Sequence, residues 1–321
     1  MEPVRIGVVG LATDRAELMA ARLNDPANPN HIPGGRIVMA LPGGNSEAHL
    51  QHASVLQDKF GVRIVEATTD FANAVDAIML LNGEETRQIS LVLEIMPLGK
   101  PLYIEPPVAI TLEGVVSILA AAEKVHIPLF SACSISPSTT DGSTAADAAI
   151  VTAPMGSLEA ALFSPSSLAA VESLFDVMGP DCEVVQALRA GPSSTLVGGW
   201  SGDRQGTLVA LHALPPESAV HVTSSSGATI EDVPARTITD LSQLLRAVID
   251  FFATGTPPVS ARQTLAVHAF LQAAYVSEQT DGRPVKLSEV LTAAGFVPPP
   301  AEAPAVSDPA PGEATGASSP Q

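Results

Sequence analysis

Short apolar runs alternate with helical stretches through the first 135 residues of the chain. The first run, Val4–Val9, ends at Gly10 and is followed by strong helix formers from Ala16 to Leu23. Further runs lie at 36–40, 61–66, 76–81, 101–104 and 127–130, with helical stretches at 86–98 and 112–124 between the later ones. Strands that are apolar on both faces and joined by helices are typical of parallel sheets. The pattern predicts an α/β unit with a doubly wound parallel sheet over residues 1–135.

The second part of the chain has a different pattern. A Ser/Thr/Ala-rich stretch leads to a helical segment at 166–178, and period-2 segments follow at 182–188, 194–200, 206–213 and 219–223. Two helical segments, 239–253 and 260–279, flank the breaker Gly255-Thr256-Pro257-Pro258. We expect residues 136–296 to form an α+β domain with a mainly antiparallel sheet. Residues 297–321 are Pro- and Ala-rich without an aromatic side chain, so we expect a disordered tail there.

Acidic residues outnumber basic ones by 34 to 16, which gives a net charge of −18. Such a charge repels the phosphates of nucleic acids and the surface of anionic membranes. The first residues carry neither a basic region nor a cleavage site. We expect a cytoplasmic protein that binds neither nucleic acid nor membrane. Cys133 and Cys182 have no Cys-x-x-Cys spacing, and we interpret both as buried free thiols.

The turn after the first apolar run is an incomplete dinucleotide fingerprint. Such a fingerprint uses glycine for the tight turn, for the approach of the pyrophosphate and for the contact between helix and strand. Only Gly10 is present here, because Ala12 and Arg15 occupy the other two positions. Leu41 stands where an acidic residue would bind the ribose hydroxyls. Both changes predict weak binding of a dinucleotide.

Several collinear segments together resemble the Gfo/Idh/MocA family of oxidoreductases. They are 4–11, 76–80 and 99–107 in the first half, and 175–179, 197–206, 250–259 and 273–287 in the second. The resemblance implies a Rossmann-type dinucleotide-binding domain, a substrate and oligomerisation domain, and NAD or NADP as cofactor. It also implies a homo-oligomer, or a hetero-oligomer with a paralogue. The cofactor-binding positions that it implies are Gly10, Leu11, Ala12, Thr13, Leu41, Asn82, Glu105 and Pro106.

The side chains that this family uses for chemistry are missing from the matching positions. The family has a lysine in its Glu-Lys-Pro segment, whereas this chain has Glu105-Pro106-Pro107. Proline can neither give a proton nor stabilise an alkoxide. By the same register a family histidine falls on Ala169. We therefore predict no catalytic residue, and weak or absent binding of NAD and NADP.

Three functional hypotheses follow. The leading one is a catalytically impaired protein, a pseudoenzyme, that keeps the scaffold as a binding or partner subunit and takes a small-molecule ligand. The alternative is an active NAD(P)-dependent oxidoreductase on a sugar-like or polyol-like substrate, with Glu105 or Glu172 as a displaced acid or base. The third is a structural subunit whose cleft is filled by side chains. For His49 and His52, three apart on a predicted helix, we expect a solvated helix face and no metal, because no third ligand has a suitable spacing.

Overall fold

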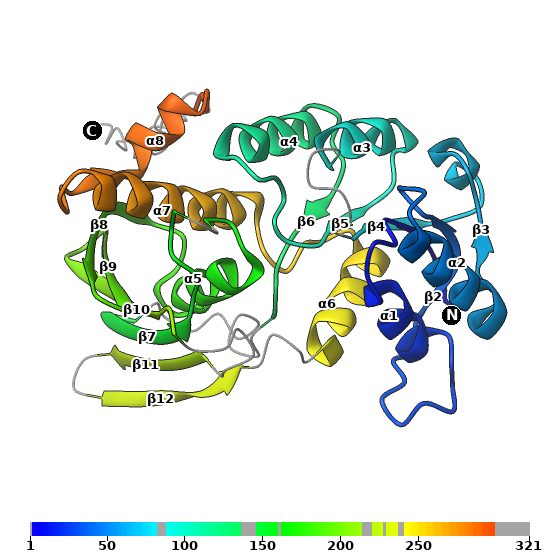
Figure 1. Ribbon diagram of the computed structural model, residues 1–321, viewed down its shortest axis with the longest axis horizontal. Helices are drawn as coiled ribbons and strands as arrows, with labels where there is room; N and C mark the ends of the chain where they lie inside the picture. The colour runs from blue at the N-terminus through cyan, green and yellow to red at the C-terminus, as the bar shows by residue number, and fades with distance from the viewer. Residues whose placement is uncertain are drawn as a thin grey trace, which may run out of the picture.

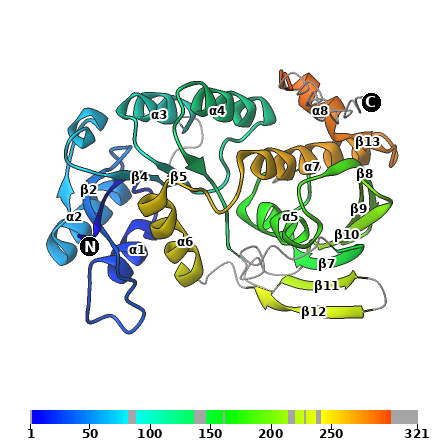
Figure 2. The same ribbon diagram turned by 180° about the vertical axis from the view of Figure 1, so that it is seen from behind.

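The computed structural model describes residues 2–81, 88–135, 146–159, 162–213, 220–226, 229–236 and 241–298. Two sheets, each covered by helices, lie side by side along the longest axis of the molecule (Figures 1 and 2). The N-terminal sheet is on the right in Figure 1 and the C-terminal sheet is on the left. This arrangement confirms the predicted fold class, a doubly wound parallel sheet followed by an α+β unit.

The first sheet has six parallel strands in the described part of the chain, in the order β3-β2-β1-β4-β5-β6. Their bounds are β1 Val4–Val9, β2 Gly35–Leu41, β3 Arg63–Ile64, β4 Ala77–Leu80, β5 Leu102–Ile104 and β6 Leu129–Phe130. The neighbours β1 and β4 mark the point where the strand order reverses. Ligands of open α/β sheets bind beyond the carboxyl ends of the strands at such a point.

Helices cover both faces of this sheet. On one face, α1 (Arg15–Leu23) and α2 (Glu47–Phe60) share a core with α6 (Leu241–Thr254), which comes from far along the chain. On the other face lie α3 (Gln88–Ile95) and α4 (Leu112–Lys124), with the short 3₁₀ helices η1 (Thr68–Phe71) and η3 (Met96–Leu98). Thr111 caps the N-terminus of α4: its hydroxyl accepts a hydrogen bond from the Gly114 N–H at 3.1 Å.

The second sheet has seven strands within the described ranges, in the order β12-β11-β7-β10-β9-β8-β13. Their bounds are β7 Ala148–Pro154, β8 Cys182–Ala190, β9 Ser193–Trp200, β10 Arg204–Leu211, β11 Val220–Ser226, β12 Thr229–Arg236 and β13 Val285–Lys286. All neighbours are antiparallel except β7 and β10, which are parallel. The mainly antiparallel sheet is confirmed, but the sequence pattern does not predict β7, β12 or β13. The strand β7 is rich in alanine, a weak strand former, and is held by partners on both sides.

Helices α5 (Pro165–Met178) and α7 (Ala261–Gln279) pack against the second sheet around the single tryptophan. Trp200 is 4% exposed and contacts Phe175 and Phe270, with ring centroids 5.4 and 6.2 Å apart. A Cβ atom on Gly198 or Gly206 would lie 2.5 or 2.8 Å from the indole ring. Only glycine at these two paired positions therefore leaves room for the tryptophan.

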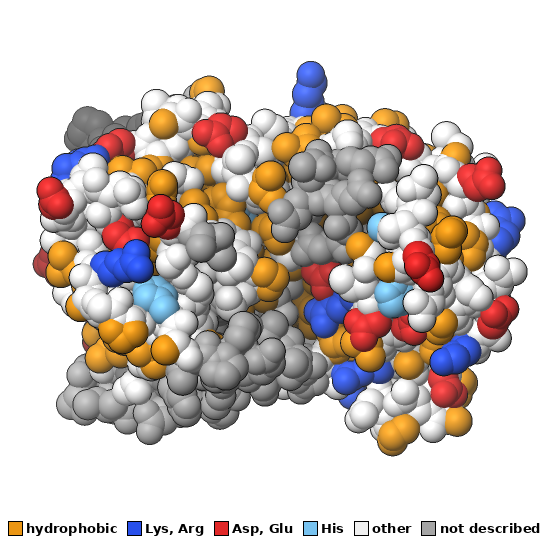
Figure 3. All heavy atoms as spheres, in the orientation of Figure 1, with side chains coloured by type: hydrophobic (Ala, Val, Ile, Leu, Met, Phe, Trp, Pro, Cys, Tyr) orange, Lys and Arg blue, Asp and Glu red, His pale blue; other side chains and the backbone are white. Residues whose placement is uncertain are grey.

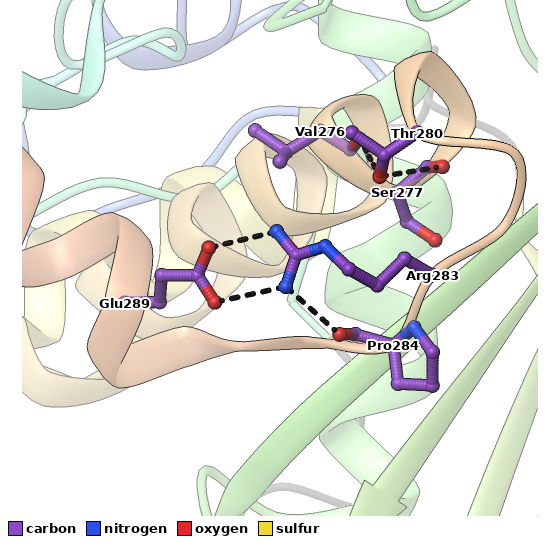
Figure 4. Close-up of polar contacts among 6 residues, drawn as sticks. All are labelled: Val276, Ser277, Thr280, Arg283, Pro284 and Glu289. Carbon is purple, nitrogen blue, oxygen red and sulfur yellow. Dashed lines mark hydrogen bonds and ion pairs between the residues drawn. The ribbon is translucent and has the colours of Figure 1, made fainter.

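The turn after α7 leads through β13 into α8 (Leu287–Ala293) and is closed by polar contacts (Figure 4). The Arg283 guanidinium donates to both carboxylate oxygens of Glu289, at 2.8 and 3.3 Å, and to the carbonyl of Pro284. The Thr280 hydroxyl donates to two carbonyls of the last turn of α7. These contacts fix the segment Gly282-Arg283-Pro284-Val285, on which part of the family resemblance rests.

The surface carries charges of both signs. On the face drawn in Figure 3, acidic and basic side chains lie scattered and often adjacent to each other among the described residues. No helix in the ranges given above is both long and apolar enough to cross a bilayer.

Candidate cofactor-binding site

Gly10 forms the tight turn at the carboxyl end of β1. Its φ is +97°, and an added Cβ would lie 2.4 Å from the carbonyl oxygen of Leu81, so only glycine fits. Its N–H donates to the carbonyl of Leu41 at 3.0 Å. The Leu41 side chain is buried in the core, 9% exposed. The structure thus brings Gly10 and Leu41, two of the predicted site residues, into direct contact.

The residues after Gly10 bond to the protein itself. Leu11 is buried, and its N–H donates to the Pro42 carbonyl at 2.9 Å. A Cβ on Gly43 would lie 3.3 Å from the Gly10 Cα, so the loop after β2 lies directly on the turn. Ala12 is half-buried, and Thr13 is exposed. One of the N–H groups that could face a pyrophosphate is therefore already bonded.

An ion pair spans the carboxyl edge of the first sheet. Arg15, the first residue of α1, donates from Nε to Oε1 of Glu105, which follows the end of β5, at 2.5 Å. The two side chains are 22% and 14% exposed. Because β4 lies between β1 and β5, this contact passes over the point where the strand order reverses. Arg15 occupies the third glycine position of the fingerprint, but its partner is 90 residues away and cannot be identified from the sequence.

The segment after β5 is anchored to the body of the first sheet. The Glu105 N–H donates to the Leu80 carbonyl at 2.9 Å, and Pro106 is buried. The Gln88 side-chain amide donates to the carbonyl of Pro107 at 2.6 Å. Asn82, also predicted for the site, lies outside the described residues.

The second predicted acid or base, Glu172, holds the chain after β6. Its carboxylate accepts the Cys133 N–H at 2.9 and 3.1 Å. Ala169, on the preceding turn of α5, is 2% exposed. Burial, with the nearby carboxylates of Glu172 and Glu105, raises the pKa of the Cys133 thiol well above its usual value. Cys133 is therefore an uncharged buried thiol.

Both cysteines are free and buried, as predicted. Burial also raises the pKa of Cys182, to about 12. A thiol that stays protonated is a poor nucleophile and a poor metal ligand. Neither cysteine is a candidate for chemistry at the cleft.

The two histidines of α2 do not share a ligand site. His49 is buried, 5% exposed, which corrects the predicted solvated face, and its Nδ1 lies 2.6 Å from the Ser46 hydroxyl. The ring faces the Gly10 turn, where it lines a pocket of about 10 Å³ together with Pro42 and Gly43, with room for about one water molecule. His52 is half-buried and contacts Glu17 at 2.6 Å. In the described part of the chain, no three His, Cys, Asp or Glu side chains are grouped as a metal site would require.

Comparison by sequence identifies no relative: no family model and no curated protein matches the chain. Comparison by structure gives many matches. A probable dehydrogenase from Thermotoga maritima has a TM-score of 0.69 at 16% identity, covering 89% of this chain and 100% of the other. The myo-inositol dehydrogenase of Lactobacillus casei, solved with NAD(H) and myo-inositol, has a TM-score of 0.69 at 14% identity, covering 89% and 97%.

The scyllo-inositol dehydrogenase of Lactobacillus casei gives the same TM-score of 0.69 at 12% identity, with 89% of this chain and 99% of the other covered. At such identities the comparison establishes the fold. The chain has the two-domain fold of these solved dehydrogenases, which is the fold that its resemblance to the Gfo/Idh/MocA oxidoreductases implies.

Proposed function

We propose that this protein uses an oxidoreductase scaffold as a binding or partner subunit, and that it does not transfer hydride. The observation that carries the proposal is the Arg15–Glu105 ion pair across the carboxyl edge of the first sheet. In the solved neighbour that contains NAD(H), the fold holds a dinucleotide. A dinucleotide that bound over the Gly10 turn of this chain would have to displace this pair first.

Two further contacts compete with a pyrophosphate at the same place. The Leu11 N–H is bonded to Pro42, and Gly43 lies against Gly10. An N–H in an existing hydrogen bond contributes to a new ligand only the difference between the two bonds, which is less than the net ~1 kcal/mol of a typical hydrogen bond. The remaining positive end of α1 can still attract an anion, so a weak residual affinity is physically reasonable.

The side chains that a dehydrogenase uses for its chemistry are also missing from the positions that the resemblance identifies. Pro106 is buried where a lysine would lie, and Ala169 is buried where a histidine would lie. General acid or base help is worth about 10²–10⁴ in rate. The two carboxylates offered by the alternative hypothesis have structural contacts: Glu105 accepts from Arg15, and Glu172 accepts from the Cys133 N–H.

The test is a calorimetric titration of NAD⁺, NADH and NADP⁺ into three proteins: the unmodified chain, Arg15→Ala and Arg5→Ala. The control is matched, because Arg5 pairs with Asp76 at 2.7 Å in the same domain, but near the amino ends of β1 and β4. We expect the unmodified protein to bind with a dissociation constant weaker than about 1 mM. Arg15→Ala should bind roughly five- to tenfold more tightly, since it removes about 1 kcal/mol of competing ion pair, and Arg5→Ala should match the unmodified protein.

The alternative hypothesis predicts the opposite sign. If Arg15 binds the phosphates of a cofactor, Arg15→Ala weakens binding. Micromolar affinity of the unmodified protein, or formation of reduced cofactor with any member of a polyol panel, would refute the proposal.

A further inference from the structure

A second pocket lies between two hydrophobic cores: the first is packed by α1, α2 and α6 against one face of the first sheet, and the second includes α5 and α7 on the second sheet. Ser131 and Ala132 directly follow β6 of the first sheet, and Val259 packs in the first core. Thr264 and His268 come from α7, which packs in the second core. All five residues line one pocket of about 10 Å³, which is also lined by Ser134, Glu172, Asp176, Gln263 and Val267. The pocket therefore joins the first sheet to the helix layer of the second.

Three buried polar atoms in this pocket have no hydrogen-bond partner. They are the Ser131 hydroxyl, the Thr264 hydroxyl and Nε2 of His268, and no other buried side-chain nitrogen or oxygen of the described residues shares this property. The three residues are 4%, 4% and 3% exposed. A buried polar group without a partner destabilises the fold, so such groups are rare unless water or a ligand bonds to them. Their occurrence in a single pocket indicates a common guest.

The tautomer of His268 determines whether the guest must donate or accept a hydrogen bond at Nε2. Nδ1 lies 2.8 Å from the Thr264 carbonyl, which can only accept, so Nδ1 carries the hydrogen. Burial lowers the pKa of His268 to about 4, which keeps the ring neutral near pH 7. Nε2 is then a pure acceptor. The guest must donate to Nε2, while the two hydroxyls can either donate to it or accept from it.

We propose that Ser131, Thr264 and His268 form an internal binding site for one neutral hydroxylic guest, a water molecule, which links the two domains. The pocket has room for about one water molecule, and buried waters typically make about three hydrogen bonds to otherwise unsatisfied groups. One bond goes to the first sheet and two go to α7. Through this water the position of β6 is coupled to that of α7.

Thr264→Val tests occupancy by the sign of its effect, because valine has the shape of threonine without the hydroxyl. If the water is present, the variant removes the hydrogen bond between the water and the Thr264 hydroxyl, and the folding equilibrium constant should fall about fivefold. If the pocket is empty, the variant removes an unsatisfied hydroxyl, and stability should stay the same or rise. Thr68→Val is the matched control: Thr68 is 2% exposed and donates to Glu94 at 2.7 Å, so its loss of stability calibrates a buried hydroxyl that has a partner.

Two further measurements keep the test independent of one variant. Ser131→Ala should also destabilise, and the double variant with Thr264→Val should cost less than the two single changes together, because both remove the same water. In the unmodified protein, NMR should show a cross-peak between water and the imidazole Hε1 of His268, which is adjacent to Nε2. A neutral or stabilising Thr264→Val overturns the proposal, and so does the absence of this cross-peak.

Discussion

Acidification should destabilise this protein through His268. The ring is 3% exposed, and burial lowers its pKa from 6.5 to about 4. In the unfolded chain the ring takes up a proton as the pH falls through 6.5, whereas the folded protein resists protonation until about pH 4. The unfolded state therefore binds more protons in this window, and the stability contributed by the neutral ring is lost as the pH falls.

The magnitude follows from the two pKa values. One pKa unit corresponds to about 1.4 kcal/mol, so the full loss from above pH 6.5 to below pH 4 is about 3 kcal/mol. About 2 kcal/mol of it is lost by pH 5. Above pH 7.5 the contribution is fully present and does not change with pH.

Urea unfolding between pH 7.5 and pH 5 measures this loss. The fluorescence of Trp200, the single tryptophan, reports on the core that contains α7 and therefore on the surroundings of His268. Carboxylates also titrate in this range, so the informative quantity is the difference between the unmodified protein and His268→Gln. That difference should shrink by about 2 kcal/mol from pH 7.5 to pH 5, whereas the exposed His126→Asn should follow the unmodified protein throughout. A His268→Gln variant with the same pH dependence as the unmodified chain would refute the reasoning.

Two further predictions concern the turn at the site and the second sheet. Gly10→Ala places a methyl group 2.4 Å from the Leu81 carbonyl at a φ of +97°, and it should lower the free energy of unfolding by about 2–4 kcal/mol. Gly61→Ala, at a φ of +66° in open space, should lower it by only about 1 kcal/mol. We also expect light scattering to detect an oligomer that forms through the outer face of the second sheet. Ile150→Lys, at a position on β7 that is 53% exposed, should then give monomers, and Leu50→Lys, at a 61% exposed position on α2, should not; a monomeric unmodified protein would contradict this interface.

The strands of the first sheet could be predicted because their sequences are unambiguous. The last four residues of Val4–Val9 and all of Ala77–Leu80 are buried, and parallel strands with both faces covered have such apolar runs. The strand β7 could not be predicted, because Ala148–Pro154 has little strand propensity of its own. Its conformation depends on pairing with β10 and β11, which are distant in sequence.

The candidate site could be located from the sequence but not its internal contacts. The incomplete fingerprint points to the Gly10 turn, and Arg15 is visible as a substituted glycine position. The pairing of Arg15 with Glu105 depends on the order of the strands, which places the ends of β1 and β5 on either side of β4. The unpartnered polar atoms between the two sheets could not be predicted either, because Ser131 and His268 are far apart in sequence and only the fold brings them to one pocket.

The Gly10 turn is stabilised by contacts within the protein itself. In a Rossmann turn that binds a pyrophosphate, some N–H groups and the positive helix end have no partner within the protein. These groups need hydrogen bonds to water or a ligand when the cofactor is absent. Here the Gly10 and Leu11 N–H groups are bonded to the carbonyls of Leu41 and Pro42, and Arg15 at the start of α1 is bonded to Glu105. Two N–H donors of the turn are therefore satisfied within the protein. Under the function that we propose, these are the contacts that compete with a bound cofactor.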